Sequence, residues 1–318
     1  MPAEMTYQQL GLSGLTVSTI GVGCNSFGAR MADEDVPAVV NTAIDAGITL
    51  FDTADVYGNA GGSEILLGRA LGSRRAEVII ATKFGSDMRG VNGPDWGARG
   101  SRRYVRIAVE SSLRRLGTDW IDLYQLHEPD PHTPIDETLA ALTEIVAEGK
   151  VRYIGSSNFA GWQVMDADWT SRTSGYEAFI SAQNEYSWLN RSVERELVPA
   201  LEHTGQSLVP FFPLGSGLLT GKYHRGEPAP TGSRLARNQA RLDRANFDLI
   251  EAIVAFATER DLSILEVAIG GLSGMPTVGS VIAGATSAEQ VKQNVAAGDW
   301  VPSGDDLEAL LEITKPAL

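Results

Sequence analysis

The chain has little of what several classes of protein depend on. It has one cysteine, Cys24, so no intramolecular disulfide can form and a reducing compartment is expected. Its four histidines show no metal-ligand spacing such as H-E-x-x-H, so no metal site is predicted. The net charge of -14 gives no electrostatic support for nucleic-acid binding. We attribute that acidity to solubility.

Long hydrophobic runs are also missing. The N-terminal residues MPAEMTYQQL lack the basic start and apolar run of a secretory signal. The least polar stretch, 265–285, is interrupted by Glu266, several glycines and Pro276, which predicts a buried helix, a turn and a strand rather than a membrane span. The sequence therefore predicts a cytoplasmic protein with no membrane partner.

Short apolar runs alternate with amphipathic helical patterns along the chain. The expected strands are 17–23, 48–52, 77–82, 120–126, 151–156, 178–183, 207–211 and 278–282. The expected helices are 35–46, 63–71, 101–116, 135–148, 161–167, 193–203, 247–260 and 287–297. Because parallel strands need a crossover and a helix supplies it, this alternation predicts an α/β fold, a closed (β/α)8 TIM barrel that forms one domain over residues 1–318.

Segments outside the repeating units complete the predicted barrel. The N-terminal segment is expected to form a β-hairpin. Long loops follow strands 3 and 7, at 84–100 and 213–246, and so lie on the face where functional loops of such barrels are found. Extra C-terminal helices are expected at 261–274 and 303–313, the last with Ser303 as its N-cap.

Four side chains with acid–base chemistry lie at or just past strand ends: Asp52 and Tyr57 in LFDTADVYG, Lys83 in IIATKFG, and His127 in DLYQLHEPD. Barrel order brings these ends to one mouth. A free phenol has a pKa near ~10, and a nearby ammonium lowers it by stabilising the phenolate. We therefore expect Tyr57 to donate a proton, with Lys83 tuning it. Asp52 would hold the ammonium, and His127 would orient a substrate carbonyl.

Each of these residues also has a plainer interpretation. Lone tyrosines and lysines are usually surface residues, and His127 can be a buried imidazole with satisfied hydrogen bonds. Asp55 is near enough to take the role of Asp52, which we prefer because it directly follows an apolar run. The joint pattern at three successive strand ends favours a catalytic site.

These stretches resemble the aldo/keto reductase family. The matching segments are IGVGCNSFG, LFDTADVYG, ATKFG, SLRRLGTDWIDLYQLHEPD, EGKVRYIGSSNF, QNEYSWLNR, PLGSGLLTGKY and VIAGATSAEQVKQN, in family order over almost the whole chain. The resemblance implies that a nicotinamide dinucleotide supplies a hydride to an aldehyde or ketone while Tyr57 protonates the oxygen. It also implies a small-molecule carbonyl substrate and, by default, a monomer.

The resemblance implies a cofactor site assembled from separate segments rather than a Rossmann motif. Gln183, with Ser157 and Asn158, is expected to bind the nicotinamide carboxamide. Phe211 is expected to stack on the ring. The other expected cofactor residues are Gly23, Cys24, Asn25, Asp52, Phe212, Pro213, Leu214, Gly215, Ser216, Gly217, Lys222, Arg234, Gly284, Thr286, Gln290, Gln293 and Asn294.

The choice between NADPH and NADH depends on charge. Many relatives carry a basic residue near the last βα turn, where this chain has Ala285 and Gln290. Arg234, from the loop after strand 7, can supply the charge for a 2′-phosphate instead. NADPH is therefore the expected cofactor, with NADH possible. Phe212 replaces a serine of many relatives, which removes a hydroxyl contact to phosphate but keeps the backbone N–H.

Two other functions stay open at this point. The family includes channel-associated members, so a cofactor-binding regulatory protein with vestigial reductase activity is the main alternative. An aldolase-like barrel would use Lys83 as a Schiff-base nucleophile, although a neighbouring Asp52 would keep that lysine protonated. Trp96 and either Tyr186 or Trp188 are expected to line the substrate pocket, whose aromatic character does not specify one carbonyl.

Overall fold

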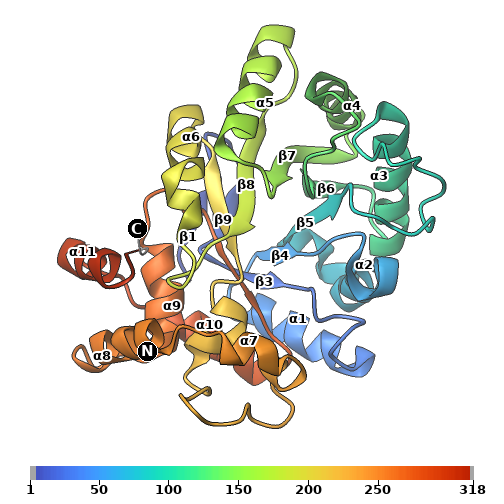
Figure 1. The fold of residues 1–318 in the computed structure, drawn as a ribbon. Coiled ribbons are helices and arrows are strands. Elements are labelled where there is room, and N and C mark those ends of the chain that lie inside the picture. The colour runs from blue at the N-terminus through green and yellow to red at the C-terminus, as the bar shows by residue number, and fades with distance from the viewer. Residues whose placement is uncertain (1–4, 316–318) are drawn as a thin grey trace.

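The computed structural model describes residues 5–315, apart from the side chain of Arg237. Parallel strands form a central barrel with helices around it (Figure 1). The barrel strands are β3 (Ile20–Gly23), β4 (Leu50–Asp52), β5 (Ile79–Phe84), β6 (Ile121–Leu126), β7 (Val151–Ser157), β8 (Phe179–Glu185), β9 (Ser207–Phe211) and β10 (Val281–Gly284). They pair in the order β10-β3-β4-β5-β6-β7-β8-β9. Leu208 N donates to Thr277 O and Gly279 N donates to Leu208 O, both at 2.8 Å, which nearly closes the barrel.

The helices lie between the strands and around them. They are α1 (Val36–Asp45), α2 (Tyr57–Leu71), α3 (Arg102–Leu116), α4 (Ile135–Ala147), α5 (Gly161–Ser174), α6 (Leu197–Thr204), α7 (Gln239–Asp243), α8 (Phe247–Thr258), α9 (Ile264–Ser273), α10 (Ala288–Ala297) and α11 (Gly304–Ile313). Short 3-10 helices are η1 (Asp33–Asp35), η2 (Gly72–Glu77), η3 (Ser192–Arg195), η4 (Gly215–Thr220) and η5 (Arg234–Arg237). The predicted (β/α)8 TIM barrel is confirmed.

Local sequence explains where these helices begin and end. At α3, the Ser101 side chain accepts a hydrogen bond from Tyr104 N, which satisfies one free donor of the first turn. Gly117 ends the helix in the left-handed conformation, with φ at 64°, and its N–H bonds to Leu113 O. Ser303 caps α11 as predicted, by accepting from Asp306 N. The helix termini therefore follow from capping residues that the sequence already displays.

The N-terminal hairpin is present and covers one end of the barrel. Its strands are β1 (Tyr7–Gln9) and β2 (Thr16–Ser18), so the single strand expected at 17–23 was wrong and is divided between β2 and β3. Gly11 N donates to Ser207 Oγ at the start of β9. Leu10, Leu15 and Val17 pack against interior barrel residues. The hairpin thus fills the amino-terminal end, which leaves the carboxyl ends of the strands open to ligands.

Other differences from the predicted boundaries are local. The helix expected at 161–167 continues to Ser174 in α5, and the one expected at 193–203 is divided into η3 and α6. The long loop predicted after strand 7 contains η4, η5 and α7. Within residues 5–315 none of the helices is both long and apolar enough to cross a membrane.

Candidate active site

A buried ion pair lies at the carboxyl ends of β4 and β5. Lys83 Nζ donates to Asp52 Oδ2 at 2.7 Å and to Thr53 O at 2.9 Å, and the Lys83 side chain is 0% exposed. Burial alone would lower the pKa of Lys83, but attraction to Asp52 and Tyr57 outweighs it and the pKa is raised. Lys83 is therefore a charged ammonium at neutral pH. Of the two aspartates considered from the sequence, Asp52 makes the contact.

Tyr57 and His127 stand beside this ion pair. Lys83 Nζ lies 5.1 Å from the centroid of the Tyr57 ring. The Tyr57 and His127 rings meet edge to face, with centroids 5.8 Å apart. His127 follows β6 directly, and its backbone N–H donates to the backbone oxygen of Phe84. The structure thus brings together all four side chains that the sequence singled out.

An unusual backbone turn follows Tyr57. Residues 58–61 all have positive φ, including Asn59 at 60° and Ala60 at 66°. Such values disfavour residues with a Cβ and are found where function requires a particular backbone path. At Gly58 no side chain fits, because an added Cβ would lie 2.5 Å from Ser63 N. This turn sets Tyr57 at the start of α2, above the barrel mouth.

Burial shifts the pKa values of Tyr57 and His127, in both cases toward the neutral form. It is the main cause that lowers the pKa of His127 to about 3, with the charge of Lys83 adding to it, so the imidazole is neutral at pH 7. Burial also raises the pKa of Tyr57 and outweighs the opposing effect of Lys83. The expected lowering by the ammonium is present, but the net direction is upward. Tyr57 is therefore a protonated phenol at neutral pH.

Two buried amides orient Asp52. Gln183 Nε2 donates to Asp52 Oδ1 at 2.7 Å, and Gln125 Nε2 approaches the same oxygen at 3.3 Å. Sequence reasoning missed Gln125. The sequence pattern that could have identified it is the alternation of side chains along a strand. Leu123 points into the barrel interior, so Gln125, two residues later, points to the same side. The carboxylate is thus bound to both amides as well as to the ammonium.

The residues predicted to bind nicotinamide lie next to these groups. Ser157 Oγ donates to Gln183 O at 2.9 Å, and Asn158 Nδ2 donates to His127 O at 2.9 Å. Phe211 ends β9, is half-buried, and contacts Phe212 edge to face with centroids 5.1 Å apart. Two side-chain amides, of Gln183 and Asn158, therefore bond directly to the catalytic residues Asp52 and His127.

Arginines approach the same mouth from two loops. Arg234 Cζ lies 4.7 Å from the centroid of the Phe212 ring. Arg30, which sequence reasoning missed, donates from the β3–α1 loop to Asn25 Oδ1 at 3.0 Å. Burial, followed by repulsion from Arg30 and Arg241, lowers the pKa of Arg234. This part of the cleft is therefore locally positive in an acidic chain.

The remaining predicted cofactor residues differ in accessibility. Thr286 N donates to Gln290 Oε1 at 2.8 Å, and Gln290 N donates to the N-cap Ser287 of α10. Four side chains are buried: Cys24, Pro213, Ser216 and Asn294. Burial raises the pKa of Cys24, which is a neutral core thiol. Of the others, Gly23 and Gly284 end β3 and β10, Leu214 lies between β9 and η4, Gly215 and Gly217 lie in η4, Lys222 follows η4, and Gln293 lies in α10.

The predicted aromatic lining of the substrate pocket was wrong for Tyr186 and Trp188. Both side chains are buried in the core, where Tyr186 OH donates to Glu194 at 2.7 Å and Trp188 Nε1 donates to Val267 O at 2.8 Å. Buried polar tips need such partners, so these aromatics are structural. Trp96 is 76% exposed and packs against the Arg103 guanidinium.

A second buried polar network lies between β5, α2 and α3. Glu64 accepts hydrogen bonds from Thr82 Oγ1 and Arg115 Nε, both at 2.6 Å. Asn92 Nδ2 lies 3.5 Å from Asp55 Oδ2, and Asp55 Oδ1 has no partner within the described residues. Burial first, and then repulsion from Glu64, raise the pKa of Asp55 well above 3.8. Arg115 therefore bonds to Glu64, whereas it only attracts the Asp55 carboxylate through space. Asp55 is the carboxyl group that favours its protonated form.

Replacing Asp55 with asparagine is expected to stabilise the protein at neutral pH. Because the folded state raises the Asp55 pKa, the wild-type contribution to stability is fully present below the ordinary value and declines as pH rises above it. Asparagine is neutral at every pH. Thermal unfolding should therefore show a gap between Asp55→Asn and wild type that grows from pH 4 to pH 8. Parallel profiles would contradict this interpretation.

The fold and the groups at its mouth define a class of protein: a parallel barrel with a buried polar site at the carboxyl ends of its strands. A sequence model described as the aldo/keto reductase family matches residues 19–315. The chain belongs to the aldo/keto reductase family.

Similar proteins extend over nearly the whole chain. One is the L-glyceraldehyde 3-phosphate reductase of Escherichia coli (strain K12), 35% identical over 92% of this chain and 88% of the relative. Another is an uncharacterized oxidoreductase, YrpG, of Bacillus subtilis (strain 168), 34% identical over 92% and 91%. A probable voltage-gated potassium channel subunit beta of Oryza sativa subsp. japonica is 34% identical over 98% of both chains. Family membership and the oxidoreductase relatives support a reductase.

Proposed function

We propose that the protein is an NAD(P)H-dependent oxidoreductase that reduces aldehydes or ketones to alcohols, with Tyr57 as the proton donor. The observation that carries the proposal is the buried Lys83–Asp52 pair with the Tyr57 ring 5.1 Å from Lys83 Nζ. The adjoining amides and the Phe211 ring suit a nicotinamide. When bound, the dinucleotide supplies the hydride.

The protein's own groups manage the proton. Tyr57 is a neutral phenol in the structure, so it has a proton to donate to the carbonyl oxygen. The phenolate left behind is stabilised by Lys83, whose position is fixed by Asp52. His127 is neutral, so its ring N–H can donate a hydrogen bond to the carbonyl oxygen without competing as an acid. A Schiff-base role for Lys83 is disfavoured because its raised pKa keeps it protonated.

A titration with NADPH and NADH, followed by a panel of aldehydes and ketones, tests the proposed function. A phosphorylated aldehyde belongs in the panel because one relative is named for reducing L-glyceraldehyde 3-phosphate. The regulatory alternative is favoured by the channel-subunit relative and would give cofactor binding with negligible turnover across the panel. Turnover with any carbonyl supports the reductase. No binding of either dinucleotide would contradict both functions.

Replacing Arg234 with glutamine is expected to weaken NADPH binding by about tenfold or more and to leave NADH binding within about twofold. The reason is that only NADPH carries a 2′-phosphate, for which the guanidinium over Phe212 is the proposed partner. Fluorescence titration with both cofactors measures this. Arg172→Gln, which replaces an exposed arginine in the last turn of α5, is the matched control. Equal weakening for both cofactors would assign Arg234 to the pyrophosphate instead.

A further inference from the structure

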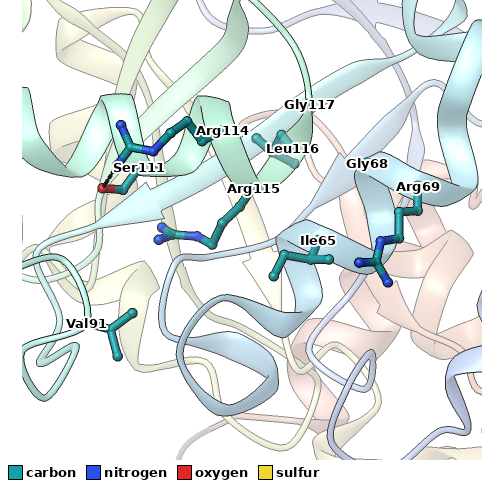
Figure 2. A pocket seen from close by; sticks show the side chains of 9 residues that line it. All are labelled: Ile65, Gly68, Arg69, Val91, Ser111, Arg114, Arg115, Leu116 and Gly117. Atoms are coloured by element: carbon teal, nitrogen blue, oxygen red, sulfur yellow. Dashed lines mark hydrogen bonds between the residues drawn. The ribbon is translucent and has the colours of Figure 1, made fainter.

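A pocket of 530 Å³ lies on the outside of the barrel, between α2 and α3 (Figure 2). Its walls include Ile65 and Arg69 of α2, Arg114 and Arg115 of α3, and Val91 of the β5–α3 loop. None of the predicted catalytic or cofactor residues lines it. Its volume is within the range of about 300–1,000 Å³ typical of small-molecule sites.

Close backbone contact gives this pocket a fixed floor. Gly68 of α2 meets Leu116 of α3 so closely that an added Cβ would collide with the Leu116 carbonyl. The Arg115 stem passes over Gly61, where a Cβ would lie 2.5 Å from Arg115 Cδ. Hydrogen bonds to Glu64 at 2.6 Å and Asn92 at 2.9 Å then hold the Arg115 guanidinium. The arginine at the base of the pocket is therefore rigidly placed.

The two other arginines of the pocket differ from Arg115, which pairs with Glu64. Arg69 and Arg114 have no acidic side chain within ion-pair distance in the part of the chain the structure describes. Arg114 donates only to Ser111 Oγ, at 2.9 Å, the dashed line in Figure 2. Six arginines of the same helices and their flanking loops pair with carboxylates, namely Arg74, Arg75, Arg99, Arg102, Arg106 and Arg115, whereas Arg89 and Arg103 outside the pocket, like Arg69 and Arg114, do not.

Two interpretations of these arginines compete. Arg69 and Arg114 lie in the last turns of α2 and α3, where a cation interacts favourably with the helix dipole. That effect needs no pocket and does not explain the apolar side chains beside the charges. In a chain of net charge -14, uncompensated guanidinium groups next to Ile65 and Val91 match a ligand that is anionic at one end and apolar at the other.

We propose that this pocket binds a small organic anion, a phosphate or carboxylate group on a short apolar body. The anionic group lies against Arg69 and Arg114, because guanidinium groups form charge-assisted hydrogen bonds with both kinds of oxyanion. The apolar body lies against Ile65 and Val91. The site is separate from the catalytic mouth, so it does not depend on the proposed reductase function.

Calorimetric titration with phenyl phosphate and with benzoate tests the proposal, using protein saturated with NADPH so that the catalytic cleft is occupied. The two probes separate a phosphate site from a carboxylate site. The test variant is Arg69→Gln/Arg114→Gln, in which both exposed arginines lose their charge. The matched control is Arg89→Gln/Arg244→Gln, which removes the same charge from two exposed arginines outside the pocket.

The test variant is expected to weaken binding of the preferred probe at least about tenfold, whereas the control variant stays within about twofold of wild type. Benzyl alcohol, the neutral analogue, should bind far more weakly than either anion. Equal affinities in the two double variants would overturn the site, as would dissociation constants above about 10 mM for both anions. If NADPH does not bind, the same titrations on the free protein still decide the question.

Discussion

Replacing Tyr57 with phenylalanine is expected to lower kcat/KM for NADPH-dependent carbonyl reduction by about 10²–10⁴-fold, the contribution typical of a positioned proton donor. The substitution removes only the phenolic oxygen. The ring that contacts Lys83 and His127 stays in place, so the ion pair and the cofactor contacts should not change. Steady-state kinetics measures the loss, and a fluorescence titration should show unchanged NADPH affinity.

Tyr7→Phe is the matched control for this variant. Tyr7 belongs to the hairpin that covers the opposite end of the barrel, and its hydroxyl donates to Gly47 O at 2.9 Å. Its loss should leave the reaction rate unchanged. A Tyr57→Phe protein that keeps its activity within a few fold would remove Tyr57 from the mechanism.

Replacing Lys83 with methionine is expected to abolish reduction and also to lower the free energy of unfolding by about 3–5 kcal/mol, the usual cost of breaking a buried ion pair. Methionine fills similar volume but leaves the Asp52 carboxylate buried without its cation. Gln125 and Gln183 still donate to that carboxylate, so the loss should fall toward the lower end of the range. Urea unfolding measures the stability change.

The double variant Lys83→Met/Asp52→Asn keeps this prediction testable if the single variant does not fold. Neither position 52 nor position 83 then carries a buried charge, so stability should recover by most of the amount lost, while activity should not return. Stability that falls further in the double variant would show that the Lys83–Asp52 attraction is not what holds these residues. Recovered activity would show that the ammonium is not needed.

Much of the candidate site could be predicted from sequence because strand ends are local features. Asp52 ends an apolar run and His127 follows another, so both were found without knowledge of their partners. Gln125 and Arg30 were missed, since each gains its meaning from a contact with a residue on another segment. Tyr186 and Trp188 were misplaced for a related reason: sequence does not show that they are buried against Glu194 of η3 and Val267 of α9.

The sequence by itself determined the architecture and the chemical groups at the mouth. Alternating apolar runs and amphipathic helices specify a parallel barrel, and barrel order then forces successive strand ends together. Only the tertiary structure decided how the pKa values of those groups shift and which aspartate pairs with Lys83. Burial raises the pKa of Tyr57 and lowers that of His127, so both shifts favour the neutral form, and the contact at 2.7 Å selects Asp52 over Asp55 as the partner of Lys83. Desolvation depends on every neighbour packed around a group, and those neighbours come from strands far apart in the chain.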